Sequence, residues 1–219
     1  MLANQRALRV SSPFMSQPPA PARGHWGKAT LLLAVLGATV GASLDALHVH
    51  TGTTAYTHPD FFGIAWWVFP EFGAAAVGIG LARPLWERLL ERRTPSQPAW
   101  SIGLAMALFV LAYALSGTLP ADWTTRSLVL VVIFGTVWAV CDRSMVGMFL
   151  AVSTALLGTS TEVALVRLDL FYYLHPNLSV VAGWLPWLYT TAAIAVGNLG
   201  KRLVDGPAPL TSGTPTAPT

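Results

Sequence analysis

Three carboxylates lie inside stretches that are otherwise apolar: Asp45, Glu71 and Glu162. A charge in hydrocarbon costs about 2.5 to 3.5 kcal/mol on insertion scales, so acids at such places indicate function. Asp45 precedes His48 by one helical turn, which favours a local Asp–His pair. Glu71 directly follows Pro70 and could bond to backbone or to a ligand head group. Glu162 lies in a run of Thr and Ser, and it could bond to another helix or line a polar pocket.

Other residue patterns argue against catalysis and metal binding. His48, His50 and His58 are close in sequence, but their spacing matches no tight ligand motif, and the single cysteine, Cys141, adds no support. The sequence contains no zinc-protease, serine-hydrolase, phosphate-loop or dinucleotide motif. We therefore predict no metal, no catalytic residue and no cofactor other than a bound lipid.

The elements that must position these acids are six apolar blocks, which we interpret as helices that cross a bilayer, a crossing that takes about 20 mostly apolar residues. Of the 219 residues, 53% are hydrophobic and only 11% are charged, and a soluble domain is about a quarter charged. This composition predicts an all-α, polytopic membrane protein. The predicted spans are 29–48, 61–82, 98–118, 126–141, 145–167 and 181–202.

The basic residues predict how the six spans are oriented. Eleven of the 13 Lys and Arg residues lie before span one, between spans two and three, between spans four and five, or at the end of span six. Only Arg126 and Arg167 lie in the other gaps. Cytoplasmic loops carry the excess of Lys and Arg, so both termini are expected in the cytoplasm. The net charge of +3 reflects this topology, and no nucleic-acid binding is expected.

The predicted domain organisation is a single transmembrane unit between two tails. Residues 1–27 and 204–219 are rich in Pro, Ser, Thr and Gly and are expected to be disordered cytoplasmic tails. The transmembrane domain is expected over 28–203. Arg residues far outnumber Lys, which indicates a GC-rich bacterial gene and hence the bacterial cytoplasmic membrane.

Prolines and small residues bear on helix packing. Pro70 and Pro186 lie near the middle of predicted spans two and six, where a proline bends a helix. Two bent helices favour a central hollow, although simple kinks fit equally well. Gly37 and Gly41 form a G-x-x-x-G pair that lets helices approach closely. Residues 74–83 and 193–202 share an Ala-x-Ala-Val-Gly-x-x-x-x-Arg pattern, which we attribute to shared packing chemistry.

Three stretches carry a family resemblance. They are residues 65–84 with Trp66-Trp67, residues 138–147 with Asp142-Arg143-Ser144, and residues 184–202 with Trp184-Leu185-Pro186. In this order and spacing they resemble the Insig family, the insulin-induced-gene membrane proteins. The resemblance implies a six-helix, non-enzymatic regulator that binds a lipid inside its bundle, an oxysterol in eukaryotes, and that engages other membrane proteins.

The resemblance also implies site residues. A pocket role falls on Trp138 and Phe109, and a partner-binding role falls on Asp142. Asp142 is also expected to cap the helix that follows the tight turn. The predicted ligand-binding residues are Trp67, Glu71, Gly73, Ala76, Phe109, Thr125 and Trp138, and the predicted partner-binding residues are Asp142 and Arg143.

The chain departs from the family pattern at the pocket. Thr125 replaces a Gln, Ala139 replaces a second Trp, and Glu71-Phe72 replaces a pair of Cys residues. An acid suits a hydroxyl or ester group better than a sterol skeleton. We therefore expect a neutral two-chain lipid such as diacylglycerol, and Trp138→Ala should weaken its retention.

Two other functions fit the sequence. A small transporter would use the proline breaks and Glu71 around a midplane site. A lipid-modifying enzyme would use Glu162 or Asp45 as an acid or base. The small-residue faces also allow a homo-oligomer.

Overall fold

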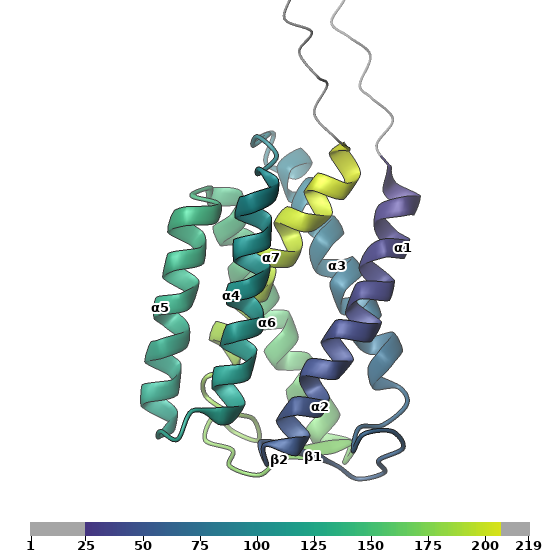
Figure 1. The fold of residues 1–219 in the computed structure, drawn as a ribbon, viewed down its shortest axis with the longest axis vertical. Helices are drawn as coiled ribbons and strands as arrows, with labels where there is room; N and C mark the ends of the chain where they lie inside the picture. Colours follow the sequence, from purple (N-terminus) through teal and green to yellow (C-terminus); the bar gives the residue numbers. More distant parts are fainter. Residues whose placement is uncertain (1–24, 207–219) are drawn as a thin grey trace, which may run out of the picture.

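The computed structural model describes residues 25–206, which fold almost entirely into long helices (Figure 1). The first helical segment runs without a break through α1 (Trp26–Leu36), the π-helical turn η1 (Gly37–Gly41) and α2 (Ala42–His50). The remaining helices are α3 (Val68–Leu89), α4 (Ala99–Thr118), α5 (Trp123–Cys141), α6 (Met145–Arg167) and α7 (Leu185–Asp205). Most of the predicted tails, 1–27 and 204–219, lies outside the described residues.

The chain is an integral membrane protein by the length and composition of its helices. Among the described residues, four helices are long and apolar enough to cross a membrane: Trp26–His50, α4, α5 and α6. Helices α3 and α7 are equally long, but they carry more charged and polar residues. The predicted spans 29–48, 98–118, 126–141 and 145–167 agree with Trp26–His50, α4, α5 and α6 to within three residues.

The prolines do not bend the helices near their middles, so that prediction was wrong. Span 61–82 was placed too early, because α3 begins only at Val68, which makes Pro70 its third residue. Pro186 is the second residue of α7. The first turn of a helix tolerates proline, since the missing N–H would have no helical partner there. The apolar residues before α3 form turns rather than a helix.

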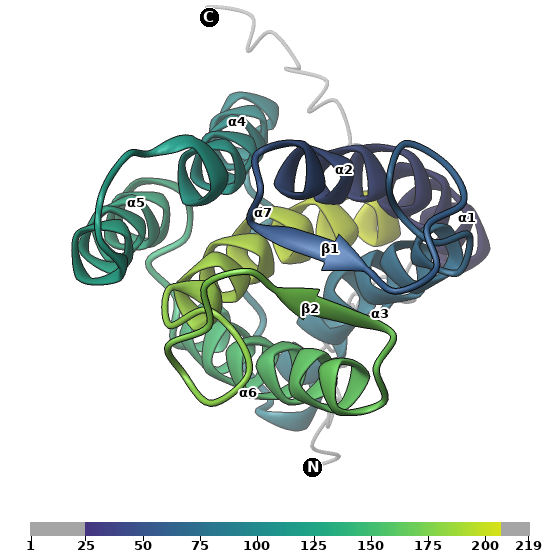
Figure 2. The ribbon, with the colours of Figure 1, turned by 90° about the horizontal axis from the view of Figure 1, so that it is seen from below.

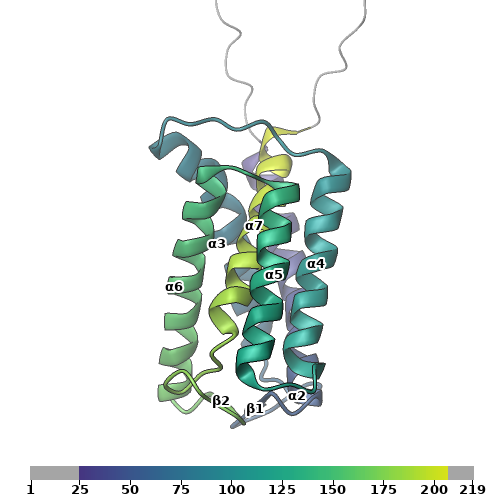
Figure 3. The same cartoon turned by 90° about the vertical axis from the view of Figure 1, so that its left-hand side faces the viewer.

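Helix α7 runs through the centre of the bundle. It packs against α3, α4, α5 and α6, and about two thirds of its residues are buried (Figures 1 and 3). Because protein surrounds this helix, its polar residues Thr191 and Asn198 do not face lipid. A helix in this position need not be as apolar as one that faces the bilayer.

The small residues predicted to bring helices together do so. A Cβ atom on Gly37 or Gly41 would collide with Phe72 of α3. On the other side of α3, a Cβ atom on Gly200 would lie 2.2 Å from the carbonyl oxygen of Gly80. The backbones of α3 and α7 therefore touch at this crossing, which only glycine permits.

A small sheet closes one end of the bundle, which we call the sheet end. Strands β1 (Thr54–Tyr56) and β2 (Phe171–Tyr173) pair antiparallel with Ala55 opposite Tyr172, and they lie side by side between α2 and α6 (Figure 2). The opposite end, where α1 begins and α7 ends, is called the terminal end. The sheet was not expected, since a three-residue strand leaves little periodic signal.

The sheet joins two halves that repeat the same local structure, shifted by 117 residues. Helix α1–α2, β1 and α3 correspond to α6, β2 and α7. After each strand the chain makes the same turn, closed by the bridges Phe61–Ile64 and Leu178–Val181. The sequence pattern shared by residues 74–83 and 193–202 is shifted by 119 residues, so it does not follow the 117-residue shift of this structural repeat.

The crossing of α3 and α7 gives a direct test. Gly200→Ala should lower the free energy of unfolding by about 1 to 3 kcal/mol, because the added methyl group meets backbone rather than a movable side chain. Gly135→Ala on α5 is the control, since nothing lies within 4 Å of the added atom there. Thermal unfolding in detergent measures both, and equal melting temperatures for the two variants would contradict the close crossing.

Candidate functional site

A cavity of about 120 Å³ lies in the bundle toward the sheet end. Its walls come from the first helical segment, α3, α4, α6, α7 and both strands, whereas α5 contributes nothing. A cavity needs about 10 to 15 Å³ to hold one water molecule, so this space is several times larger than that minimum. It is therefore large enough for a lipid head group with the first part of its chains, but not for two whole acyl chains.

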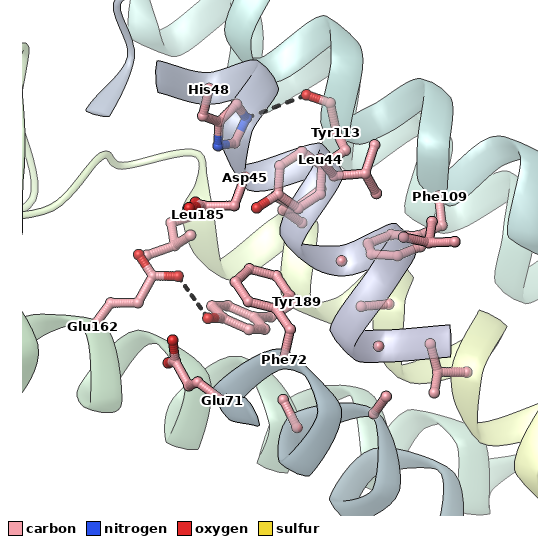
Figure 4. Close-up of a pocket in the computed structure, with 18 of the residues that line it drawn as sticks. Leu44, Asp45, His48, Glu71, Phe72, Phe109, Tyr113, Glu162, Leu185 and Tyr189 are labelled. Atoms are coloured by element: carbon pink, nitrogen blue, oxygen red, sulfur yellow. Dashed lines mark hydrogen bonds between the residues drawn. The ribbon is translucent and has the colours of Figure 1, made fainter. Parts of the chain in front are cut away.

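The walls are polar at one end of the cavity and apolar at the other. Carboxylates of α2, α3 and α6 point into the polar end, where Figure 4 shows Asp45, Glu71 and Glu162 around one space. The side chains toward the terminal end are apolar. They include Leu36, Val40, Ile79, Met106 and Val196.

Two of the carboxylates are held by tyrosines in equivalent ways. The hydroxyl of Tyr56 donates to Asp45 Oδ2 at 2.6 Å, and the hydroxyl of Tyr173 donates to Glu162. Tyr189 donates a second bond to Glu162, at 2.6 Å. The shift of 117 residues relates Asp45 to Glu162 and Tyr56 to Tyr173, so the two halves of the chain supply the same pair twice.

A tryptophan completes each pair. The ring of Trp67 packs edge-on against Tyr56 with centroids 5.6 Å apart, and that of Trp184 packs in the same way against Tyr173 at 6.2 Å. Acid, tyrosine and tryptophan follow one another at intervals of 11 residues in both halves. Sequence reasoning missed the tyrosines, and this doubled spacing is the signal that could have found them.

His48 does not pair with Asp45 as expected. Its Nε2 lies 2.9 Å from the hydroxyl oxygen of Ser116 and 3.3 Å from the carbonyl oxygen of Tyr113, and its ring stacks on Tyr113 (Figure 4). Ser116 already donates its own proton to that carbonyl, so Nε2 must be the donor to Ser116. His48 thus ties α2 to α4 and forms part of the cavity wall.

Glu71 is the exception among the three acids. Within residues 25–206 no hydrogen-bond or ion-pair partner faces its carboxyl group, and the shift of 117 relates it to Leu188, which lines the same cavity. The backbone freed by a mid-helix proline cannot be its partner, because Pro70 lies in the first turn of α3. Glu71 is therefore free to meet a ligand.

The predicted ligand-binding residues are only partly brought together. Glu71, Ala76 and Phe109 line the cavity. The ring of Trp67 packs against Tyr56. Gly73 packs against the backbone of α1, where a Cβ atom would lie 3.0 Å from the carbonyl oxygen of Ala34. The structure places both outside the lining.

Trp138 and Thr125 lie away from the cavity because both belong to α5. The indole N–H of Trp138 donates to the carbonyl of Ser144 at 3.2 Å, which steadies the turn between α5 and α6. Thr125 is exposed in the first turn of α5. Hydrogen bonding by its side chain and its backbone N–H holds the pKa of Asp122 below its ordinary value.

The predicted partner-binding residues lie at the terminal end, where Asp142 belongs to a network of buried charges. Arg83 is fully buried and donates to the carboxylate of Asp142 and, at 3.1 Å, to the hydroxyl of Ser144. Glu87 accepts from Lys201 of α7 at 2.7 Å. The network fixes α3 to α7 and to the turn between α5 and α6.

The connection between α3 and α4, which we call the strap, is fastened to this network. Its Thr94 hydroxyl donates to Glu87, and its Ser96 hydroxyl donates to Asp205 at 2.5 Å. Figure 3 shows this connection running across the end of the bundle where α7 ends. These two hydrogen bonds hold the strap to α3 and α7.

Asp142 does not cap α6, so that prediction was wrong. Ser144 is the N-cap, and its hydroxyl accepts the N–H of Gly147 at 2.9 Å. Asp142 instead accepts the N–H of Ser144 at 2.9 Å while it pairs with Arg83. Its side chain is fully buried, whereas Arg143 is exposed with a φ of 60°. Only Arg143 of these two is placed for direct contact with a partner.

No group of three His, Cys, Asp or Glu residues in the described part of the chain is arranged to hold a metal ion. His50 and His58 are exposed. The acids considered for acid–base chemistry, Asp45 and Glu162, are both held by tyrosine hydroxyls.

The buried ion pair can be tested by a double-mutant cycle. Arg83→Met leaves Asp142 buried without a counter-charge, which should lower the free energy of unfolding by about 3 to 5 kcal/mol. The double variant Arg83→Met, Asp142→Leu should lose clearly less, since no charge is then left unpaired. Thermal unfolding in detergent measures these changes, with Arg143→Gln as the control that stays within about 0.5 kcal/mol. Additive losses in the double variant would contradict the pairing.

Comparisons with known proteins agree with this architecture. The family model of the insulin-induced protein (INSIG) matches residues 28–204. The insulin-induced gene 1 protein of Bos taurus is 30% identical over 189 residues, which are 83% of this chain and 68% of that protein.

Two solved structures are also similar. The Insig homologue of Mycobacterium vanbaalenii has a TM-score of 0.70 and 26% identity, and the match covers 79% of this chain and 92% of that one. A cross-linked trimer of the mycobacterial protein matches with a TM-score of 0.71 and 26% identity, over 81% of this chain and 94% of that one. From its sequence and its fold, this chain belongs to the insulin-induced protein (INSIG) family.

Proposed function

We propose that this protein is a non-enzymatic, lipid-binding and lipid-sensing membrane protein whose cavity takes a neutral lipid of the diacylglycerol type. The observation that carries the proposal is a cavity with a polar end and an apolar end inside a membrane bundle. Such a lipid is itself polar at one end and apolar along its chains. The polar end of the cavity would meet the polar end of the lipid, and the apolar end would meet its chains. This match gives a reason for the acids to lie inside the bundle.

The acyl chains have a way out of the cavity. Helix α4 packs against α2 near the sheet end but does not pack to a comparable extent against α1 or η1 (Figure 1). Leu36 and Val40 line the cavity from the first helical segment, and Met106 and Phe109 line it from α4. Val40 is 38% exposed, so the lining reaches the outer surface of the bundle. Chains leaving here would enter the bilayer directly.

The transporter alternative loses its structural basis. It relied on helices broken near the middle of the membrane, whereas Pro70 and Pro186 lie in the first turns of their helices. The strap and the ion-pair network also bind the terminal end together from several directions. A cavity that opens sideways to lipid fits a sensor better than a path between two aqueous sides.

The proposed topology has all six long helical segments crossing the membrane and both ends in the cytoplasm, in a bacterial cytoplasmic membrane. The described chain begins and ends at the same end of the bundle, as six crossings require. That end carries Arg83, Arg143 and Lys201. Proposed partners are other membrane proteins at this end and further copies of the chain, since a relative has been solved as a trimer.

Lipid content tests the proposal. Protein purified in mild detergent should carry a neutral lipid, measured by extraction and mass spectrometry against a detergent blank. Ala192→Phe places a ring into the cavity wall and should remove most of this lipid. Ala74→Phe on the exposed face of α3 is the matched control and should retain it. Trp138→Ala should also retain it, because α5 does not line the cavity. No lipid above the blank in the unchanged protein would refute the proposal.

Topology is testable because Cys141, the single cysteine, is buried. His25→Cys lies at the terminal end and His58→Cys lies near the sheet end, and both positions are exposed. A membrane-impermeant maleimide should label His58→Cys at the outer face of the cytoplasmic membrane, and it should label His25→Cys only after permeabilisation. If His25→Cys is labelled at once and His58→Cys only after permeabilisation, the orientation is inverted. If both are labelled from the same side, the two ends of the bundle do not lie on opposite faces of the membrane.

A further inference from the structure

We infer that the polar end of the cavity is a head-group site that selects a lipid with a free hydroxyl group over its esterified and phosphorylated forms, with Glu71 as the selecting residue. This inference rests on the proposed lipid-binding function and names the chemistry that the site recognises. It follows from which polar groups around the cavity are already bonded and which are not.

Hydrogen-bond acceptors are left over at this end of the cavity. Tyr56 occupies one oxygen of Asp45, but within residues 25–206 nothing bonds to the other oxygen, Oδ1. Both oxygens of Glu71 are also without a partner in this part of the chain. An acceptor in an apolar surrounding is costly unless a donor reaches it, so the site favours a ligand that brings a hydroxyl proton.

Donors are available for the rest of the head group. Thr54 lines the cavity, is only 2% exposed, and has no partner for its hydroxyl among the described residues. The hydroxyl of Tyr113 likewise has no partner within that range, while its ring is fixed by His48. Two hydroxyl donors beside two acceptor groups match a glycerol head that carries ester carbonyls and one free hydroxyl.

A phosphate group would be poorly accommodated. Three carboxyl groups surround the space, and no Lys or Arg is among the described residues that line it. Phosphate binding in proteins relies strongly on Arg and Lys side chains, and the described lining provides neither. An anionic lipid would therefore lose its hydration without gaining a counter-charge.

The repeat separates Glu71 from the other acids. Asp45 and Glu162 occupy equivalent places in the two halves and are held by equivalent tyrosines, so both have a structural role. Glu71 corresponds to Leu188, which shows that the fold accepts a leucine at the matching place. The fold therefore does not require an acid at this position, and we attribute the acid to ligand binding.

The test compares three probes on purified full-length protein in nanodiscs: dioleoylglycerol, its acetate ester and dioleoyl phosphatidate, each displacing a fluorescent diacylglycerol. The unchanged protein should bind dioleoylglycerol at least about tenfold more tightly than either other lipid, which corresponds to about 1.4 kcal/mol. Glu71→Leu, which copies the residue at the matching place in the second half of the chain, should lose this preference while it still binds the acetate ester. Glu91→Gln, on an exposed residue at the terminal end, is the control and should keep the preference.

Failure of this inference is distinguishable from failure of the proposed function. Equal binding of dioleoylglycerol and its acetate by the unchanged protein would overturn the selection while lipid binding stands. A preference that survives in Glu71→Leu would overturn the role of this residue, and tight binding of phosphatidate would overturn the exclusion of anions. If none of the three lipids displaces the fluorescent probe, or if the probe does not bind, the proposed function itself falls.

Discussion

The ion pair between Arg83 and Asp142 holds together two parts of this bundle that lie 59 residues apart in the sequence. Arg83 comes from α3, and Asp142 comes from the turn between α5 and α6, where Ser144 also bonds to both. Both charged side chains are fully buried. Since an unpaired charge in such a place is very costly, the three elements can move relative to one another only if this pair is broken.

This constraint changes how the Asp-Arg-Ser turn is understood. Its aspartate is a structural centre rather than a contact surface, because its side chain has no exposed area. A partner at this end would meet Arg143 and the strap between α3 and α4, which the same network positions through Thr94 and Glu87. Loss of Asp142 would then alter a partner surface by changing its shape rather than by removing a contact.

The repeat explains how a mostly apolar bundle supports a polar cavity. Each half brings one acid, one tyrosine and one tryptophan, and the small sheet places the two sets next to each other. The tyrosine hydroxyls satisfy most of the oxygens of these two acids internally, so the acids are tolerated without basic residues. Of the three acids, Glu71 lies outside this repeated arrangement and remains fully available for recognition.

The sequence by itself determined the helical membrane architecture, the family and four of the spans to within three residues, because apolar periodicity and length are local properties. It also identified Asp45, Glu71 and Glu162 as unusual, because an acid in an apolar stretch is visible in one dimension. It did not reveal that Pro70 lies in the first turn of a helix, since the apolar residues before α3 form turns that composition does not distinguish from a helix. Only the tertiary structure decided that Phe109 reaches the cavity and Trp138 does not, and that Asp142 is buried, because these facts depend on which helix faces which.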